Sequence, residues 1–151
     1  MRGSRPPAAL PMPDIEFCLL PEVCQPLLDK FYRAHRSPMR SSSGSQMWVA
    51  RQPDIIGALC LRPVAGGYWL TGLFVDPDWR SQGIAGRLIA QALKDVAGTV
   101  WLFCDPDLAG FYERYGFKLA DDLPQSLAEK LMRYSRAKAL VAMSSRRPNN
   151  L

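Results

Sequence analysis

The chain has 151 residues, of which 48% are hydrophobic and 22% are charged, and its formal net charge is +5. This length and composition indicate one soluble globular domain and argue against a disordered chain. No apolar run approaches the roughly 20 residues of a membrane-spanning helix, which excludes a membrane protein. The N-terminal segment is interrupted by prolines and lacks the apolar centre of a signal peptide, so we expect a cytoplasmic protein.

The cysteines and the single histidine do not form a metal-binding pattern. Cys18, Cys24, Cys60 and Cys104 lack CxxC spacing, and each stands among apolar residues. We therefore expect buried, reduced thiols and no metal site. The positive charge suits a polyanionic partner, either a phosphorylated cofactor or nucleic acid. A nucleic-acid-binding module is the weaker alternative, because the basic residues do not alternate with exposed aromatic side chains along one element.

Two polar ends flank the predicted domain. Residues 1–13 combine four prolines with small residues, and residues 144–151 are polar and basic. Both compositions are typical of flexible segments. We therefore predict a single folded domain at residues 14–143, between a flexible N-terminal arm and a flexible C-terminal tail.

The first half of the domain predicts a strand, a helix and a three-stranded meander. The helix has apolar residues at helical spacing from Val23 to Tyr32, and Pro26 requires it to kink or to start late. Residues 37–45 have the composition of a flexible loop. Tight turns join the three strands of the meander. The expected strands of this half are 15–20, 46–51, 55–64 and 68–75.

The second half alternates helices and strands. The segment 100–104 is an apolar strand of the buried kind, and a helix at 84–96 separates it from strand 68–75. Two strands joined by a crossover helix should be parallel neighbours. The order of elements predicts an α/β (α+β) fold with a mixed, mostly antiparallel sheet and helices on both faces. The remaining elements expected are a helix at 108–115, a strand at 117–120, a helix at 124–138 and a strand at 140–143.

A loop with little side-chain bulk joins strand 68–75 to the following helix. It contains Arg80, Gly83, Ala85 and Gly86, so that backbone N–H groups and the positive end of the helix dipole meet at one place. Such a place binds an anion, most often a phosphate. The spacing of the small residues matches neither the dinucleotide-binding G-x-G-x-x-G pattern nor the P-loop pattern G-x-x-x-x-G-K-[ST]. The loop therefore requires another phosphate-bearing ligand.

Two motifs resemble those of one enzyme superfamily, the GNAT acetyltransferases. The first is similar to the acyl-CoA-binding motif R/Q-x-x-G-x-G/A and consists of Val75, Pro77, Arg80, Gly83 and Ala85. The second, at residues 105–117, is similar to the superfamily's N-x-x-A…lYeklGF segment. The resemblance covers residues 47–117 convincingly. It implies a single-domain GNAT fold in which the central pair of parallel strands is splayed apart.

The resemblance also implies which residues hold acetyl-CoA. The pyrophosphate would lie on the backbone amides of the loop, and the pantetheine arm would pair with the end of strand 68–75. The thioester would enter the gap between that strand and strand 100–104. No metal is implied. The implied cofactor-binding residues are Leu73, Phe74, Val75, Arg80, Ser81, Gln82, Gly83, Ile84, Ala85, Gly86, Asp105, Leu108, Phe111 and Tyr112.

Tyr112 matches the superfamily tyrosine that hydrogen-bonds or protonates the departing thiolate. A phenol with a pKa near 10 can donate to a thiolate whose conjugate acid has a pKa of about 8 to 9.

Asp105 stands where the superfamily often has asparagine, and the alternative is that it caps the short helix that follows. The general base is left open among Asp76, Glu113 and His35.

The resemblance thus implies an N-acetyltransferase that transfers an acetyl group from acetyl-CoA to a primary amine of a small molecule or peptide. The amine would attack directly, with Tyr112 as general acid. The alternative is a non-catalytic, CoA-sensing protein of the same fold that regulates a partner protein, which the absence of an evident base favours.

The acceptor and the oligomeric state are left open. Three basic residues would either attract an acidic acceptor or solvate a helix end and a loop, namely Arg33, Arg36 and Arg40. Sheet edges in such folds often pair, which leaves a homodimer open.

Overall fold

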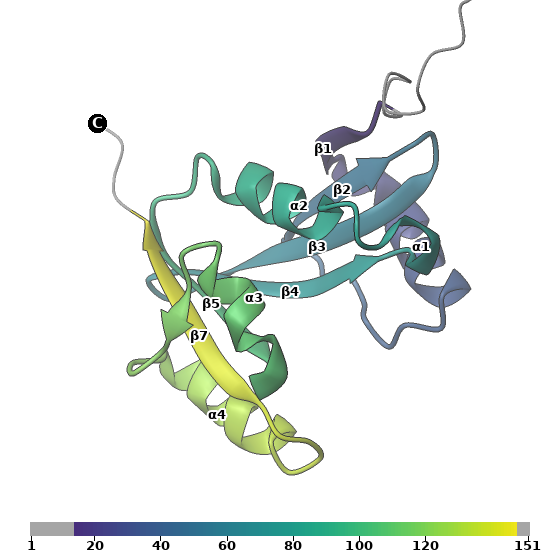
Figure 1. Cartoon of the computed structure of the whole chain (residues 1–151). Helices are drawn as coiled ribbons and strands as arrows, with labels where there is room; N and C mark the ends of the chain where they lie inside the picture. The colour runs from purple at the N-terminus through teal and green to yellow at the C-terminus, as the bar shows by residue number, and fades with distance from the viewer. Residues whose placement is uncertain (1–13, 148–151) are drawn as a thin grey trace, which may run out of the picture.

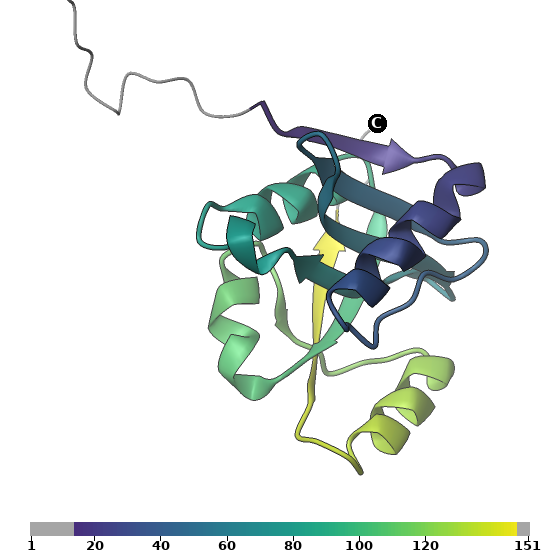
Figure 2. The same cartoon turned by 90° about the vertical axis from the view of Figure 1, so that its right-hand side faces the viewer.

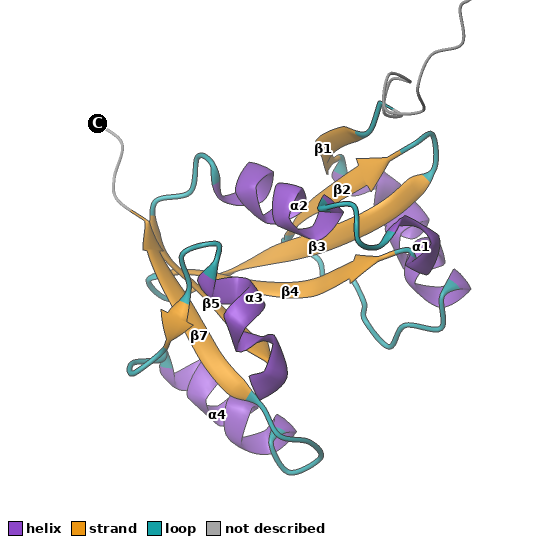
Figure 3. Cartoon of the chain, viewed as in Figure 1, coloured by secondary structure: helices purple, strands orange, loops and turns teal. Residues whose placement is uncertain are grey.

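The computed structural model of the chain describes residues 14–147 and contains one seven-stranded sheet covered by helices (Figure 1 and Figure 3). The predicted arm at 1–13, and residues 148–151 of the predicted tail, lie outside the described residues. The strands are β1 (Glu16–Leu20), β2 (Gln46–Arg51), β3 (Ile55–Val64), β4 (Gly67–Val75), β5 (Gly98–Cys104), β6 (Lys118–Leu119) and β7 (Val141–Arg147). The helices are α1 (Gln25–Ala34), α2 (Ile84–Leu93), α3 (Ala109–Glu113) and α4 (Gln125–Tyr134). The 3-10 turns that precede α1, α2 and α3 are η2 (Glu22–Cys24), η3 (Pro77–Trp79) and η4 (Pro106–Leu108).

The strand order β1-β2-β3-β4-β5-β7-β6 confirms the predicted mixed sheet. Strands β1 to β4 are antiparallel neighbours, β4 and β5 are parallel, and β5, β7 and β6 are again antiparallel. Helix α2 is the crossover between the two parallel strands, as its place in the sequence predicted. The predicted fold class, with one parallel pair at the centre of a mostly antiparallel sheet, is therefore confirmed.

Helices cover both faces of the sheet, because successive residues of each strand point to opposite sides. In β3, Leu59 and Leu61 pack in the same cluster as Leu88 of α2, whereas Ala58 and Cys60 pack with α1. Helix α3 lies on the α2 face, and α4 lies on the α1 face at the other half of the sheet. Figure 2 views the molecule from the side of α1 and α4. The two faces thus carry separate apolar clusters.

Several element boundaries differ from the sequence prediction. Helices α2, α3 and α4 end at Leu93, Glu113 and Tyr134, before the predicted ends at residues 96, 115 and 138, and β5 starts at Gly98 rather than at residue 100. Strand β7 continues to Arg147, so residues 144–147, predicted as part of a flexible tail, form a strand between β5 and β6. Pairing with β5 along this segment decides the outcome, and Ser145 is buried although its neighbours are polar. Of the two alternatives predicted for the first helix, a kink or a late start, the late start is confirmed. Helix α1 starts at Gln25, and Pro26 stands in its first turn, where a missing N–H breaks no helical hydrogen bond.

The cysteine prediction is confirmed in part. All four thiols are free, and Cys60 and Cys104 are buried, but Cys18 and Cys24 are partly exposed. Within residues 14–147, no three His, Cys, Asp or Glu side chains are grouped so that they could hold a metal ion. No helix in the described part of the chain has the length and apolar character needed to span a membrane.

A β-bulge and an early end of pairing separate β4 from β5. In β4, Gly72 and Leu73 together stand opposite Leu59 of β3. The parallel pairing of β4 with β5 extends only from Gly67 to Trp69. Beyond this point β4 follows β3 while β5 follows β7, and the two halves of the sheet diverge in Figure 1. This is the splayed central pair that the resemblance implied.

Tyr32 of α1 anchors the bulge from the opposite face. Its hydroxyl donates a hydrogen bond of 2.7 Å to the carbonyl oxygen of Gly72, whose φ of 66° lies in the left-handed region. The Tyr32 side chain is buried, and burial raises the pKa of its phenol, so it is a permanent donor. A Cβ at Gly72 would stand 2.7 Å from this hydroxyl, so both the conformation and the space require glycine.

Tyr32→Phe is expected to lower the free energy of unfolding by about 1 to 2 kcal/mol, because the ring remains packed while the Gly72 carbonyl loses its donor. Urea denaturation followed by circular dichroism measures the loss. Tyr68→Phe, on β4 itself, removes a hydroxyl for which no hydrogen bond is found among the described residues, and it should change stability by less than about 0.5 kcal/mol. Equal losses in the two variants would contradict the anchoring role of Tyr32.

Candidate active site

The loop between β4 and α2 turns through two left-handed residues, Ser81 with a φ of 66° and Gly83 with a φ of 77°. A Cβ at Gly83 would meet no atom within 4 Å, so a side chain there would project into open space at the start of α2. At the other end of the loop, the Asp76 carboxylate accepts a hydrogen bond of 2.9 Å from the Asp78 N–H and fixes the start of η3. The loop therefore has a defined shape and an accessible backbone.

The start of α2 presents free hydrogen-bond donors. The first helical hydrogen bond runs from the Arg87 N–H to the Gly83 carbonyl oxygen, so the N–H groups of Ile84, Ala85 and Gly86 have no helical partner. No acidic side chain stands in the first turn to occupy them. These N–H groups and the helix dipole favour an anion at this place, as the loop sequence predicted.

A cleft of about 490 Å³ lies in front of these donors. Its walls are the end of β4, the loop, the first turn of α2, and the helix α3 with the end of η4. All of the cofactor-binding residues implied by the sequence line it, except Gln82 and Asp105. Trp79 and Tyr115 also line the cleft, and neither was identified from the sequence. The two sequence motifs, which are about 20 residues apart in the chain, thus meet across one cavity.

Arg80 closes the loop back onto the end of β4. Its Nε donates a hydrogen bond of 2.9 Å to the carbonyl oxygen of Val75. Its guanidinium carbon lies 5.1 Å from the centroid of the Phe74 ring, where the cation is attracted to the aromatic face. The side chain therefore holds the shape of the loop and also places a positive charge at the wall of the cleft.

Tyr112 reaches the cleft from α3. Its side chain is 8% exposed, and its ring packs edge-on against Phe111 at a centroid distance of 5.1 Å. Burial raises the pKa of Tyr112 to about 12, and the Cys104 thiol at the end of β5 adds to the effect. The phenol is therefore neutral over the whole physiological range. A neutral hydroxyl at the wall of this cleft is suited to donate a proton or a hydrogen bond to a developing anion.

Gly86 and Tyr115 explain why a small residue is needed in the first turn of α2. A Cβ at Gly86 would overlap the Tyr115 hydroxyl and would lie 2.8 Å from the Cε1 atom of its ring. The glycine thus admits the Tyr115 ring beside the helix, where it lines the cleft. This contact joins α2 to the turn that follows α3, and its two partners lie 29 positions apart. No local pattern in the sequence identifies it.

Asp105 caps the turn that precedes α3. Its carboxylate accepts a hydrogen bond of 2.8 Å from the Asp107 N–H, and Pro106 occupies the first position of η4. The capping alternative raised by the sequence is therefore confirmed. The side chain is exposed and does not line the cleft, so its implied contact with a cofactor stays a prediction.

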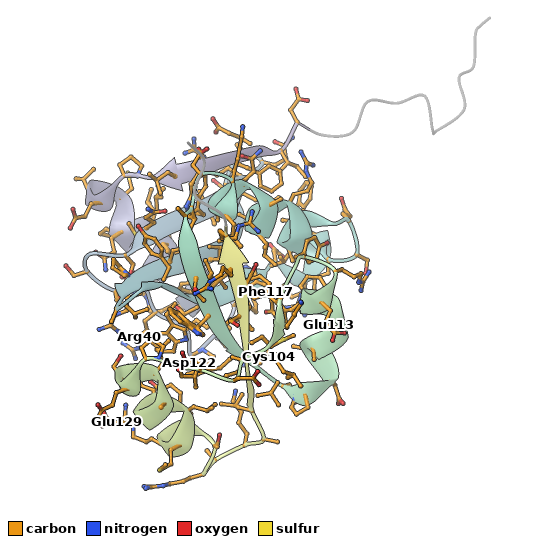
Figure 4. All side chains as sticks on the ribbon, turned by 90° about the vertical axis from the view of Figure 1, so that its left-hand side faces the viewer. Arg40, Cys104, Glu113, Phe117, Asp122 and Glu129 are labelled. Atoms are coloured by element: carbon orange, nitrogen blue, oxygen red, sulfur yellow. The ribbon has the colours of Figure 1, made fainter. Side chains whose placement is uncertain are left out.

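The three candidate bases lie outside the cleft. His35 and Asp76 approach each other, with 3.6 Å between Nε2 and Oδ2, and the His35 ring packs 5.6 Å from that of Phe74. Glu113 is exposed on α3, where Figure 4 labels it. None of the three lines the cleft. The structure therefore pairs two of the candidates with each other but brings no base to the side of Tyr112.

A family model described as an acetyltransferase (GNAT) domain matches residues 43–119, about half of the chain. Among solved structures, the chain is similar to the ribosomal-protein-S18-alanine N-acetyltransferase of Escherichia coli, with 15% identity and a TM-score of 0.66. That match covers 91% of this chain and 97% of the other. No curated protein matches the chain in sequence.

Two further structures have the same architecture. One is Arabidopsis thaliana Naa50 in complex with the bisubstrate analogue CoA-Ac-MVNAL, with 15% identity, 87% of this chain and 97% of that chain covered, and a TM-score of 0.63. The other is an acetyltransferase of the GNAT family from Staphylococcus aureus, with 17% identity, 87% and 98% covered, and a TM-score of 0.59. At these identities the likeness shows the fold. Together with the family match over both motifs, it shows that the chain belongs to the GNAT acetyltransferase family.

Proposed function

We propose that the chain is an N-acetyltransferase that binds acetyl-CoA in the cleft and transfers the acetyl group to a primary amine. One observation carries the proposal, which is that the free N–H groups of α2 and the edge of β4 that β5 leaves unpaired open into the same cleft. The first suits a pyrophosphate, and the second suits an amide-bearing chain such as pantetheine. Membership of the GNAT family supports the same ligand.

The proposed reaction is direct attack of the amine on the thioester, held in the gap between β4 and β5. A C–N bond forms at the carbonyl carbon, the C–S bond breaks, and CoA leaves as a thiolate. Tyr112, whose pKa is raised to about 12, donates its proton or a hydrogen bond to that sulfur. The proton lost by the nitrogen restores the neutral phenol. The products are the N-acetyl amine and CoA, and holding both substrates in one geometry would supply much of the acceleration.

The acceptor would lose its extra proton before attack. None of His35, Asp76 and Glu113 lines the cleft, and none lines the cavity on the opposite face of the sheet, so no side chain among the three is placed to take a proton from a nitrogen beside the thioester. An ammonium ion has no lone pair for attack, so the neutral fraction of the amine would limit the rate. The proposal therefore requires an acceptor whose ammonium pKa is lowered in its site.

Isothermal titration of the protein with acetyl-CoA tests the proposal directly. We expect one-site binding that CoA itself competes for, followed by release of free CoA thiol when an accepted amine is added. Failure to bind at millimolar acetyl-CoA would overturn the assignment of the cleft. Binding without turnover across small amines, amino acids, polyamines and peptide N-termini would instead favour a CoA-sensing protein, which the position of the candidate bases outside the cleft also supports.

Gly86→Ala is expected to weaken acetyl-CoA binding by about tenfold or more, which is the effect of one misplaced methyl group in a tight site. The added Cβ would displace the Tyr115 ring from its place beside α2 and into the cleft. The Kd from the same titration measures the change. Gly110→Ala on α3 is the matched control, because a Cβ there meets no atom within 4 Å and Gly110 does not line the cleft. Equal affinity in all three proteins would show that acetyl-CoA does not use this wall.

A further inference from the structure

A second cavity, of about 290 Å³, opens on the α1 and α4 face of the sheet. It is bounded by the loop that follows α1, the middle of β4, the end of β5, and the segment from the end of α4 to β7. In Figure 4, Arg40 of that loop and Glu129 of α4 lie on one side of β5 and β7, and Glu113 of α3 lies on the other. The second cavity is therefore on the face opposite to the cleft between the end of β4, the start of α2 and α3, which is called the donor cleft because it is proposed to hold acetyl-CoA.

Adjacent segments of β4 line the two cavities. Leu70 to Gly72 line the second cavity, and Leu73 to Val75 line the donor cleft. The change of side falls at the bulge, where β4 has already separated from β5. A small molecule in the second cavity would therefore approach the gap between the two strands from the face that the donor cleft does not occupy. The inference drawn from this cavity rests on the proposed acetyl transfer.

Positive charge dominates the second cavity. Arg40 and Lys138 are the ionic side chains that line it, and no acidic side chain does. Neither of the two takes part in a salt bridge with any residue that the structure describes. Unpaired cations around a small cavity attract an anionic group, and a guanidinium can hold a carboxylate through two hydrogen bonds.

An aromatic wall stands next to these cations. The rings of Trp69 and Phe103 lie 5.3 Å apart, and those of Phe103 and Tyr134 lie 6.4 Å apart, all three lining the cavity. The cavity thus combines an apolar wall with two cations.

The loop that carries Arg40 is held in place. The Ser41 hydroxyl donates to the Asp29 carboxylate at 2.8 Å, and the Ser41 N–H donates to the same oxygen at 3.3 Å. Gln25 adds a hydrogen bond of 2.8 Å from Nε2 to the Ser41 hydroxyl oxygen. These bonds attach the loop to α1, so the Arg40 wall of the cavity is formed before any ligand binds.

We propose that the second cavity binds the acceptor and selects a small primary amine that carries a carboxylate on an aromatic or apolar body. Arg40 and Lys138 hold the carboxylate, and Trp69, Phe103 and Tyr134 hold the body. The same two cations disfavour the ammonium form of the bound amine, which increases the neutral fraction that can attack in a site without a base. Amines with several positive charges and no anionic group, such as polyamines and aminoglycosides, are repelled.

Matched acceptor pairs test the inference in steady-state assays that detect free CoA thiol. L-phenylalanine and 2-phenylethylamine share one aromatic body and differ by the carboxylate, and spermidine represents the polycations. We expect kcat/KM to be at least about tenfold higher for L-phenylalanine than for 2-phenylethylamine, the effect of a charge-assisted hydrogen bond. Spermidine should be the poorest of the three. Binding of L-phenylalanine to the CoA-loaded protein, followed by titration calorimetry, gives a readout that does not depend on turnover.

Arg40→Gln and Lys138→Gln locate the effect. Each should raise the KM for L-phenylalanine by roughly tenfold, whereas the KM for 2-phenylethylamine and the KM for acetyl-CoA should each stay within about twofold of the wild-type value. Lys118→Gln on β6 is the control, since it removes one positive charge from an exposed residue that lines neither cavity. A preference for L-phenylalanine that survives both variants would remove the two cations from acceptor binding.

The outcomes separate this inference from the proposed function. If acetyl-CoA does not bind, both fail. If acetyl-CoA binds and spermidine or 2-phenylethylamine is acetylated better than L-phenylalanine, acetyl transfer stands and the carboxylate preference is overturned. If acetyl-CoA binds but L-phenylalanine neither reacts nor gives heat with the CoA-loaded protein, the preference is likewise overturned.

Discussion

Tyr112→Phe is expected to lower kcat by about 10²- to 10³-fold, the effect of removing one hydrogen-bond donor from a developing anion. The Kd of acetyl-CoA should change by no more than about twofold, because phenylalanine keeps the ring that packs against Phe111 and Phe117. Single-turnover kinetics with preloaded acetyl-CoA separate the chemical step from binding. Tyr68→Phe, which also removes a hydroxyl but lines neither cavity, is the matched control.

The pH dependence follows from the direction of the Tyr112 shift. The pKa of its phenol rises from 10.0 to about 12 in the folded protein, chiefly because the side chain is buried. The neutral form is thus favoured by folding, and its contribution to stability is complete below about pH 10 and lost as the pH rises toward 12. Wild-type kcat should show no decrease from ionisation of Tyr112 up to about pH 10. A basic limb that lies near pH 8 and disappears in Tyr112→Phe would contradict this.

If Tyr112→Phe were as active as the wild type, a group other than Tyr112 would have to donate to the departing thiolate. Complete transfer of the proton from Tyr112 to the CoA thiolate is unfavourable, because a phenol with a pKa of about 12 is a weaker acid than a CoA thiol, whose pKa is about 8 to 9. The hydroxyl would therefore act by a hydrogen bond that strengthens as charge develops on sulfur. Such a hydroxyl acts in its neutral form and does not have to ionise before the reaction begins.

The donor cleft was largely predictable because its parts are local in sequence. A strand end, a loop of small residues and a helix start follow one another between Leu73 and Gly86, so their spacing alone places the N–H groups at one point. Asp105 likewise caps a turn within its own segment. Tyr115 was missed because its place depends on contact with Gly86, which lies 29 positions earlier in α2, so no local sequence pattern reveals it.

The second cavity was beyond the reach of the sequence for a similar reason. The composition of residues 37–45 predicted a flexible loop, whereas hydrogen bonds to Asp29 hold Ser41 and therefore its neighbour Arg40. Strand β7 exceeded its predicted end because pairing with β5 outweighs the polar character of residues 144–147. Local propensity decides an element only where tertiary pairing does not compete with it.

The separation of β4 and β5 depends on how closely the two strands approach where they do pair. At the start of that contact, a Cβ on Gly67 would overlap the carbonyl oxygen of Thr99 and would lie 2.8 Å from its carbonyl carbon. Both atoms belong to the backbone of β5, so no side-chain rotation can relieve the overlap. A methyl group here would have to push the two strands apart at the place that sets their separation further along.

Gly67→Ala is therefore expected to lower the free energy of unfolding by about 3 kcal/mol or more, at the upper end of the cost of overpacking a core. Chemical denaturation measures the loss, and acetyl-CoA titration of the folded fraction should show weakened binding, because the mouth of the gap shifts. Gly110→Ala adds the same methyl group in α3, where a Cβ meets no atom within 4 Å, and should be neutral or stabilising by up to about 1 kcal/mol. If Gly67→Ala also stayed within 1 kcal/mol of the wild type, the approach of β4 to β5 would be adjustable. The gap between β4 and β5, in which the thioester is proposed to lie, would then have to be maintained by other contacts, with the Tyr32–Gly72 anchor as the first to test.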